Sequence, residues 1–518
     1  MMWNLVWFKR DLRLHDHAAL WHAQQKPIIA LYIFEPDYWN LSDTSQRQWA
    51  FTREALLDLD QQLQRYGGRL LCMAGQAEHC LSQLLDRLDT PVAMHSHEET
   101  GNLWTYDRDK RIKALLRERS DNPRVEWNEY PQNGVKRPNG NRDNWAQHWN
   151  TWMTQPQFPA PDALSFVPLE EITSAEDSDF IFTPEQLPVS VPCSLPEVHQ
   201  PQTGGRTAGL AVMNDFLGQR GEYYRGSISS PLTAENGCSR LSPYLALGCI
   251  GMRELVQAVR NRRRTAEGRW KASLSAFESR LWWHCHFIQK LEDQPDMEVQ
   301  NLHPLTEQLD RPFDEEKFEA WKTGNTGWPM VDASMRYLIA NGWVNFRMRA
   351  MLISIASYPL ALPWQPVSRY LASLFTDYEP GIHYPQVQMQ AGTTGINIPR
   401  MYNPILQAQR LDAKGLFVRR WIPELQQVSD QWIFEPWLMP RTIQESARCI
   451  LNKDYPAPLV DFSAATRKAR ADLKAVRDSD FFATAQSIGE KHGSRKRSSS
   501  RRMTGKKKAR DAGQMTLF

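Results

Sequence analysis

The chain has 518 residues, of which 41% are hydrophobic and 23% charged, an ordinary balance for a folded protein with about two to four domains. No stretch approaches the ~18 consecutive apolar residues of a membrane helix, which excludes an integral membrane protein, and the N-terminus has the pattern of a strand rather than of a signal peptide. The seven cysteines are scattered and form no C-x-x-C pair, so we expect a reducing, cytoplasmic compartment and neither a disulfide framework nor a zinc ribbon.

Residues 1–130 alternate short apolar runs with amphipathic stretches. The predicted strands are Leu5–Phe8, Ile28–Phe34, Arg69–Met73, Val92–His95 and Val125–Trp127. The predicted helices between them are Gln46–Tyr66, Glu78–Leu88 and Thr105–Arg117. This alternation predicts an α/β domain built on a parallel sheet with right-handed crossovers. The segment lacks the G-x-G-x-x-G fingerprint that is usual for dinucleotide binding.

Residues 131–203 are rich in Pro, Asn, Ser and Asp and are predicted as a long connector on the surface between two domains. From 204 to 470 the pattern is helical, which predicts a large all-α domain. Its clearest helices are expected at Ala208–Gln219, Arg253–Arg263, Ser273–Leu291, Asp332–Ala340 and Pro366–Phe375.

The net charge of +3 conceals an asymmetry, because ten basic residues and no acidic one lie between Lys491 and Arg510. Such a composition cannot bury enough apolar surface to fold alone, so residues 471–518 are predicted to be a basic, largely disordered tail. The tail would bind phosphate backbone without sequence preference. The alternative is a tail that only increases solubility.

Two segments of the helical domain carry chemistry-bearing side chains. In His284-Cys285-His286, adjacent helical residues point ~100° apart and do not converge on one ion, so no metal site is predicted. The segment Gly237–Ser242 offers backbone N–H groups, two hydroxyls and a cation to a diphosphate. The alternative for this segment is an ordinary helix cap.

Five ordered motifs resemble the photolyase/cryptochrome flavoproteins. They are Trp7–Asp16 (WFKRDLRLHD), Cys238–Gly248 (CSRLSPYLALG), Thr326–Arg336 (TGWPMVDASMR), Gly342–Arg349 (GWVNFRMR) and Tyr402-Asn-Pro with Arg419–Leu425 (RRWIPEL). The resemblance runs from residue 2 to about residue 470. It implies an N-terminal antenna domain and a C-terminal helical domain that holds FAD.

The resemblance also implies which residues contact FAD. The positions that match the grip on the diphosphate and ribose are Tyr224, Cys238, Ser239, Arg240, Leu241 and Ser242. Arg349 and Asp377 match an ion pair beside the isoalloxazine ring, Glu379 matches a second carboxylate, and His383 matches the residue that faces flavin N5. A purely structural salt bridge would explain Arg349 and Asp377 equally well.

Several positions depart from the family pattern. The positions that hold a flipped lesion in photolyases read Arg280, Trp283, Phe346, Ala350 and Met389, with Arg347 beside them, and only Trp283 is retained. In the tryptophan chain that relays electrons to the flavin, Trp364 keeps the middle place. The flavin-proximal place reads Val387, and the surface place falls near Arg311. Other aromatic residues, among them Trp328, Trp343, Tyr384 and Trp421, are candidates to replace the missing members.

The resemblance implies a light-driven photolyase that uses FAD and acts on UV-damaged DNA, single- or double-stranded. Trp364 and His383 would be its catalytic residues. The alternatives are a cryptochrome-type photoreceptor and an unrelated nucleotide-binding enzyme. No residue of the α/β domain decides whether it holds a second antenna chromophore (a folate, a deazaflavin or a second flavin) or none. We expect a monomer. Gln514, Leu517 and Phe518 resemble the Q-x-x-L-F peptide that docks on the bacterial sliding clamp.

Overall fold

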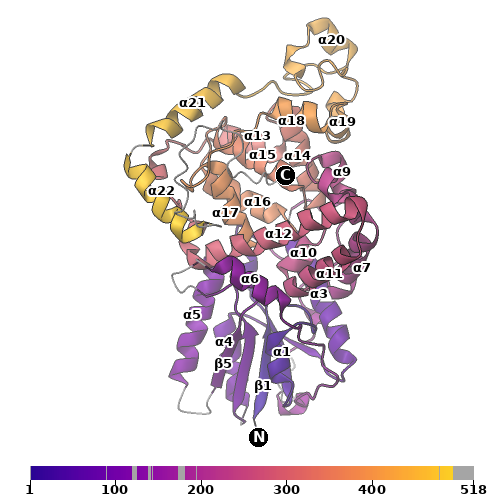
Figure 1. The fold of residues 1–518 in the computed structure, drawn as a ribbon, viewed down its shortest axis with the longest axis vertical. Helices are drawn as coiled ribbons and strands as arrows, with labels where there is room; N and C mark the ends of the chain where they lie inside the picture. The colour runs from indigo at the N-terminus through magenta and orange to yellow at the C-terminus, as the bar shows by residue number, and fades with distance from the viewer. Residues whose placement is uncertain are drawn as a thin grey trace, which may run out of the picture.

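The structure is a computed structural model that describes residues 2–88, 90–119, 125–137, 142, 144–172, 181–193, 195–477 and 479–493. The described residues up to 130 form a sheet flanked by helices, and those from 206 to 492 are largely helical (Figure 1). The predicted fold class, an α/β domain followed by a large helical domain, is confirmed.

Five strands form one parallel sheet in the order β3-β2-β1-β4-β5. They are β1 (Trp3–Phe8), β2 (Ile28–Phe34), β3 (Leu70–Ala74), β4 (Val92–His97) and β5 (Val125–Tyr130), and each was predicted. The helices of this domain are α1 (Ala18–Ala23), α2 (Pro36–Trp39), α3 (Gln46–Gln64), α4 (Ala77–Arg87) and α5 (Leu103–Glu118). The two shortest, α1 and α2, were not predicted because so few residues show no helical period.

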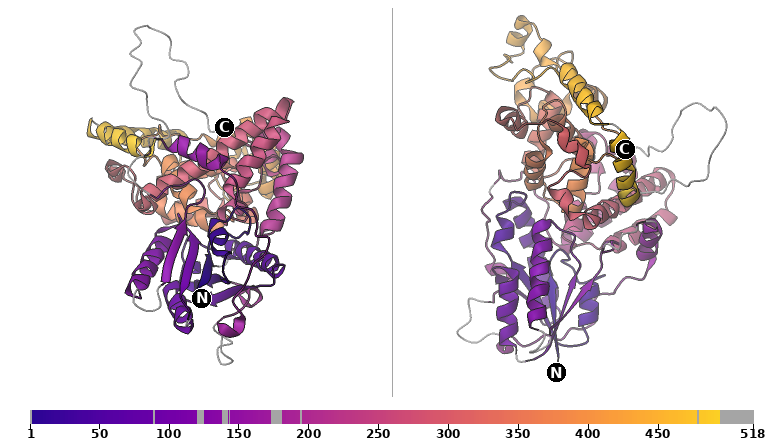
Figure 2. Two further views of the ribbon diagram at one scale, coloured as in Figure 1. Left: turned by 60° about the horizontal axis from the view of Figure 1, so that its bottom comes forward. Right: turned by 90° about the vertical axis from the view of Figure 1, so that its left-hand side faces the viewer.

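Alternate residues of β1 pack on opposite faces of the sheet. Leu5 and Trp7 pack with the buried residues of α4 and α5, whereas Val6 and Phe8 pack with those of α1 and α3. Helices therefore cover both faces, as the views in Figure 2 show. All six residues of β1 are buried, which explains why all of them except Asn4 are apolar.

The connector 131–203 contains one helix that was not predicted, α6 (Trp145–Thr154). Trp145, Trp149 and Met153 are buried in a core cluster that includes residues of both domains. Farther along, Phe166 forms a bridge beside Ile28 of β2. The connector is thus packed into the structure rather than only wrapped around it, and its prolines obscured the helical spacing of the three buried side chains.

The helical domain is built around α12, which packs against α11 and α17. Its helices are α7 (Arg206–Gly218), α8 (Tyr224–Ser227), α9 (Pro231–Gly237), α10 (Ser242–Ala246), α11 (Met252–Arg264), α12 (Gly268–Asp293), α13 (Glu315–Thr323), α14 (Pro329–Asn341), α15 (Phe346–Ser357), α16 (Trp364–Leu374), α17 (Pro380–Ala391), α18 (Pro404–Leu411), α19 (Leu416–Trp421) and α20 (Arg441–Ser446).

Two further helices, α21 (Phe462–Ala475) and α22 (Ser479–His492), run along one side of this domain (Figure 1). The predicted start of the disordered tail at residue 471 is therefore wrong. Phe481 is buried and stacks on His303 with 3.9 Å between ring centroids. The sequence reasoning overlooked this apolar face because the charges that follow it dominate the composition.

The residues beyond 493, including Gln514, Leu517 and Phe518 of the expected clamp peptide, lie outside the described residues. Within the described ranges, no helix is both long enough and apolar enough to cross a membrane.

The segment between β1 and α1 joins the two domains. The Arg10 guanidinium donates to the carbonyl oxygens of Ala246 (3.0 Å) and Tyr378 (2.9 Å), and Arg13 donates to that of Gly248 (2.8 Å). Gly248 has φ +62°, and a Cβ there would lie 2.4 Å from the Arg10 carbonyl oxygen, so only glycine fits this close approach. The first motif of the sequence is therefore the contact between the domains.

Candidate functional site

The loop Cys238–Ser242 lies between α9 and α10 and turns at Arg240, which has φ +60°. The Arg240 guanidinium lies 4.1 Å from the centroid of the Trp343 ring, and its Nε donates to Gln202 at 3.1 Å. Leu241 is fully buried in the core. The loop therefore offers a ligand its backbone and the hydroxyls of Ser239 and Ser242, while the side chains of Arg240 and Leu241 are engaged by the protein.

Tyr224 of α8 and Arg280 of α12 were expected at the diphosphate and at the lesion respectively. They lie close enough together for the positive charge of Arg280 to act on the Tyr224 hydroxyl and to oppose the effect of burial on its pKa. Burial raises the pKa of Tyr224 above its usual value, so the phenol is protonated at neutral pH. The residues expected at the diphosphate and at the lesion therefore lie next to each other.

Arg349 and Asp377 form the expected ion pair. The Arg349 guanidinium donates to Asp377 Oδ2 at 2.9 Å and to the Val344 carbonyl at 2.7 Å, and it lies 4.0 Å from the Phe375 ring centroid. Among the described residues, neither Asp377 Oδ1 nor Asn345 Oδ1, both buried, has a hydrogen-bond partner. An unpaired buried acceptor costs about 1–3 kcal/mol. These two oxygens can accept hydrogen bonds from the N–H edge of a flavin ring, and the Arg349 guanidinium can donate to the carbonyl oxygens of the same ring.

Glu379 is committed to other partners. Its carboxylate caps α17 by accepting from the Gly381 N–H at 3.3 Å, and it forms an ion pair with Arg10 at 3.1 Å. Its observed contacts therefore belong to the domain boundary rather than to the expected second carboxylate of the flavin site. Sequence alone gave no sign of the pairing, because Arg10 lies in the other domain.

His383 of α17 is buried, and its Nε2 lies 2.9 Å from the carbonyl oxygen of Ser368. A carbonyl oxygen only accepts hydrogen bonds, so Nε2 carries the hydrogen and Nδ1 keeps its lone pair. Burial lowers the pKa of His383 to about 4. The side chain is therefore neutral at physiological pH and presents an acceptor at Nδ1.

The expected lesion residues come from three helices, of which α12 and α15 each pack against α17. Trp283 lies on α12, Phe346 and Arg347 begin α15, and Met389 lies near the end of α17. The Trp283 ring stacks on Phe287 with 5.5 Å between centroids. These side chains therefore lie on neighbouring helices, and the contact with Phe287 holds the Trp283 ring in position.

The expected electron relay is interrupted. Trp364 is buried and donates from Nε1 to Asn301 at 2.6 Å. Val387 is also buried, and Arg311 donates to the carbonyl of Ala391 at 3.0 Å. An aliphatic side chain and a cation thus occupy the two outer places, and neither can be oxidised as an indole can.

A cavity of about 70 Å³ lies where the sheet meets the helical domain, and sequence reasoning did not find it. Aromatic rings and paired charges line it, among them Trp7, Arg10, Tyr38, Glu99 and Arg108. Arg108 is buried and pairs with Glu99 at 2.7 Å and with Glu35 at 2.9 Å. Burial raises the pKa of Glu35 to about 7. The cavity is far smaller than the ~300 Å³ of typical ligand pockets.

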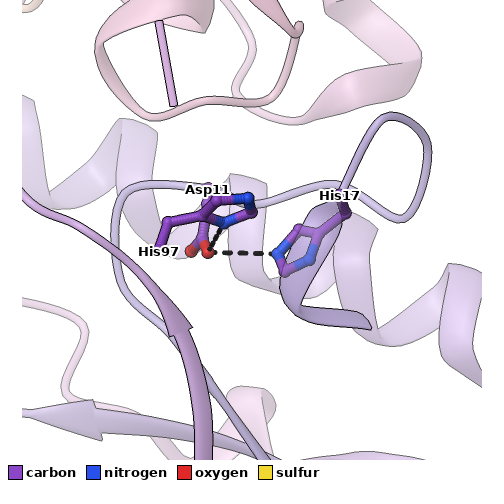
Figure 3. Close-up of side chains that lie close together, drawn as sticks. All are labelled: Asp11, His17 and His97. Atoms are coloured by element: carbon purple, nitrogen blue, oxygen red, sulfur yellow. Dashed lines mark hydrogen bonds and ion pairs between the residues drawn. The ribbon is translucent and has the colours of Figure 1, made fainter. Parts of the chain in front are cut away.

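Asp11, His17 and His97 form a buried cluster at the end of β1 (Figure 3). Their potential ligand atoms lie within 4.8 Å of one another. His17 Nδ1 accepts from the Leu20 N–H at 3.0 Å, so its Nε2 carries the hydrogen, and Nε2 lies 3.1 Å from Asp11 Oδ2 without hydrogen-bond geometry. His97 Nδ1 is hydrogen-bonded to the same oxygen at 2.7 Å. Both nitrogens next to the carboxylate carry hydrogens, so the cluster is a polar hub rather than a metal centre.

This hub predicts acid sensitivity. Burial lowers the pKa of His97 to about 4, whereas an unfolded histidine titrates near ~6.5. The unfolded chain therefore binds a proton that the folded chain excludes, and stability falls as the pH drops from ~6.5 to 4, by about 3 kcal/mol from this group. Urea unfolding between these pH values measures the slope. His97→Gln should flatten it, and an unchanged slope would contradict the assignment.

The comparisons with known proteins agree with this geometry. Residues 4–133 match the family model described as DNA photolyase, and residues 277–475 match that of the FAD binding domain of DNA photolyase. The chain is 26% identical to a deoxyribodipyrimidine photo-lyase from Alkalihalophilus pseudofirmus, over 90% of this chain and 97% of that protein. It is 28% identical to a cryptochrome DASH from Gloeobacter violaceus, over 90% and 95%.

Solved structures of the same kind share the fold. A cryptochrome from Synechocystis matches with a TM-score of 0.79 at 24% identity, covering 91% of this chain and 99% of that one. An archaeal photolyase from Sulfolobus tokodaii with two FAD molecules matches with a TM-score of 0.72 at 25% identity, covering 92% and 100%. Since the two family models together span more than half of the chain and the relatives extend over nearly all of it, the chain belongs to the photolyase/cryptochrome family.

Proposed function

We propose that the chain is a photolyase that binds FAD and repairs UV-induced pyrimidine photoproducts in DNA under blue light. The observation that carries the proposal is the ion pair of the half-buried Arg349 with the buried Asp377, together with two buried acceptors that lack a hydrogen-bond partner among the described residues, Asp377 Oδ1 and Asn345 Oδ1. The guanidinium would stabilise a flavin that carries negative charge, and the acceptors would orient its N–H edge.

In this mechanism the reduced flavin, when bound, supplies an electron to the lesion on absorbing light. The chain's own residues position the reactants. His383 offers a neutral acceptor at Nδ1, since its Nε2–H is held by Ser368. Trp283 and Phe346 offer aromatic faces to unstacked bases, and base–aromatic stacking contributes ~1–3 kcal/mol per base. Arg347 begins α15 next to Phe346, where a guanidinium can contact a phosphate.

The test is a repair assay in light and in darkness. It uses the reduced, flavin-loaded protein and short single- and double-stranded oligonucleotides, each with one defined cyclobutane or (6-4) lesion. We expect light-dependent restoration of one lesion type, and we expect Trp283→Ala to weaken lesion binding about 10- to 100-fold. Trp270→Ala, on the same helix but beside Arg262, is the matched control. A loaded protein that restores neither lesion would overturn the proposal.

The second candidate function is a cryptochrome-type photoreceptor. The observation that favours it is the altered set of lesion positions, in which Phe346, Ala350 and Met389 replace the family's residues, together with the similarity to a cryptochrome DASH. In that case light would change the flavin and its surroundings without any repair. A protein that is photoreduced but restores neither lesion fits this function.

A second chromophore would use the cavity at the domain boundary. The Sulfolobus protein carries two FAD molecules, and the cavity here has the aromatic lining that a second ring system needs. At about 70 Å³ it admits no ring system until the ion-paired side chains of Glu35, Glu99 and Arg108 move. We therefore propose that any second chromophore binds by displacing this network.

A further inference from the structure

Two tyrosine hydroxyls and one carboxylate oxygen form a closed triangle of polar contacts at the domain boundary, all within hydrogen-bonding distance and sharing the two phenol hydrogens. The Tyr378 hydroxyl lies 2.6 Å from Asp43 Oδ2, the Tyr384 hydroxyl lies 3.2 Å from the same oxygen, and the two hydroxyls are 3.1 Å apart. All three side chains are buried, with at most 6% exposed. The carboxylate comes from the loop before α3, and the phenols come from the start of α17 and the turn before it.

The triangle is attached to the flavin site. Tyr378 directly follows Asp377, the partner of Arg349, and Tyr384 directly follows His383. The His383 ring centroid lies 5.5 Å from that of Tyr378 and 5.4 Å from that of Tyr384, and both contacts are edge-to-face. Two oxidisable rings therefore touch the residue expected beside flavin N5, whereas the tryptophan place of the relay holds Val387.

We propose that Tyr378, with Tyr384 bound to its hydroxyl, is the residue that gives an electron to the photoexcited oxidised flavin, and that Asp43 takes the proton. The inference rests on the proposed flavin site but not on lesion repair. Tyr378 loses one electron, the flavin gains it, and the phenol O–H bond breaks as the proton crosses 2.6 Å to Asp43 Oδ2. The products are a neutral tyrosyl radical, a neutral carboxylic acid and a flavin that has gained one electron and with it the negative charge first held by the carboxylate, so charge and atoms balance.

The chemistry of Asp43 suits a proton acceptor. The groups that donate to its Oδ2 are all neutral, namely the two phenols and the Asn102 amide at 3.2 Å. None of these donors carries a charge, and Oδ2 lies at hydrogen-bonding distance from the phenol that would release the proton. Burial and the Asp43 charge also raise the pKa of both phenols well above the usual value, so each tyrosine holds its proton until it is oxidised.

A tyrosine without a base nearby is a poor electron donor, because the oxidised phenol must lose its proton. That requirement singles out Tyr378 from tyrosines such as Tyr358, whose buried hydroxyl has no hydrogen-bond partner among the described residues. One other buried pair has the same chemistry, since the Tyr455 hydroxyl lies 2.5 Å from Asp332 Oδ2. That pair joins α14 to the loop after α20, whereas His383 lies on α17, so it provides a matched control.

The test is electron paramagnetic resonance on the full-length, flavin-loaded protein, frozen under blue light with the flavin oxidised at the start. We expect a tyrosyl radical whose hyperfine splitting collapses when the protein is made with ring-deuterated tyrosine. This measurement needs no variant and so does not depend on how a mutant folds. A signal that is insensitive to deuterated tyrosine, with the flavin photoreduced, overturns the inference.

Variants locate the radical. We expect Tyr378→Phe to lower the radical yield at least tenfold, Tyr384→Phe to lower it several-fold, and Tyr455→Phe to leave it unchanged, each at equal flavin content. Asp43→Asn should slow flavin photoreduction and remove the slowing that wild-type protein shows in D2O. Equal radical yields in Tyr378→Phe and wild type would overturn the assignment.

The outcomes separate this inference from the proposed function. Lesion repair without a tyrosyl radical leaves the photolyase proposal standing and overturns the relay. A tyrosyl radical without repair of either lesion supports the relay and overturns the proposed repair. A purified protein that cannot be loaded with flavin overturns both.

Discussion

Replacing Arg349 with methionine is expected to reduce the flavin content of the purified protein at least tenfold. Asp377 is buried, with 4% of its side chain exposed, and Arg349 Nη2 at 2.9 Å is its ion-pair partner. Removing one partner of a buried ion pair costs about 3–5 kcal/mol, because the other charge stays uncompensated. The flavin would then lose its guanidinium and meet an unpaired carboxylate. The ratio of flavin to protein absorbance and urea unfolding measure the two effects.

A double variant separates a cofactor role from a purely structural one. Arg349→Met with Asp377→Leu removes both charges, so we expect most of the stability to return while flavin binding stays lost. Arg441→Met is the matched control, because its pair with Glu445 is exposed on both sides and such pairs contribute only ~0–1 kcal/mol. Full flavin content in the double variant would show that the ion pair only supports the fold.

The second large effect is expected at Arg10. Its guanidinium lies in the boundary between the domains and contacts the Ala246 and Tyr378 carbonyls and the Glu379 carboxylate. Arg10→Met leaves the buried Glu379 carboxylate unpaired and two carbonyls short of a donor, which predicts a loss of about 3–5 kcal/mol. Urea unfolding should show a lower midpoint, and limited proteolysis should cut the connector faster.

The control for Arg10 is Arg69→Met in the α/β domain. Arg69 also pairs with carboxylates, Asp60 and Glu185, but 41% of its side chain is exposed. We expect a change within ~1 kcal/mol there. Comparable losses of stability at both arginines would contradict the view that Arg10 contributes more to the free energy of unfolding because it lies at the domain boundary.

The elements that the sequence predicted are those with long, regular patterns. The strands β1, β2 and β3 are mostly apolar because helices cover both faces of the sheet, and α3 and α12 repeat their buried residues at helical spacing. The missed helices are short, or their apolar spacing is hidden by the neighbouring sequence. Examples are α1 with six residues, α6 among prolines, and α22 next to the charged C-terminus. Their formation depends on packing partners that lie far away in the chain.

The candidate site, too, has residues that the sequence could predict and residues that it could not. Arg349 and Asp377 were predicted from motifs, and the structure joins them at 2.9 Å. The roles of Glu379 and Asp43 could not be predicted, because their partners lie 369 and 335 residues away and neither belongs to a local pattern. Burial, which fixes the charge state of His383, likewise follows only from the packed helices.

The joining segment between β1 and α1 also determines the order in which the protein is completed. Arg10 leaves the ribosome 369 residues before its partner Glu379. Contacts so distant in sequence form late, since the loop between them must close first. Until then the Arg10 side chain of the nascent α/β domain lacks its partners from the helical domain. Docking of the helical domain is therefore expected to be the final folding step, and truncated chains that end before α17 should be poorly soluble and prone to capture by chaperones.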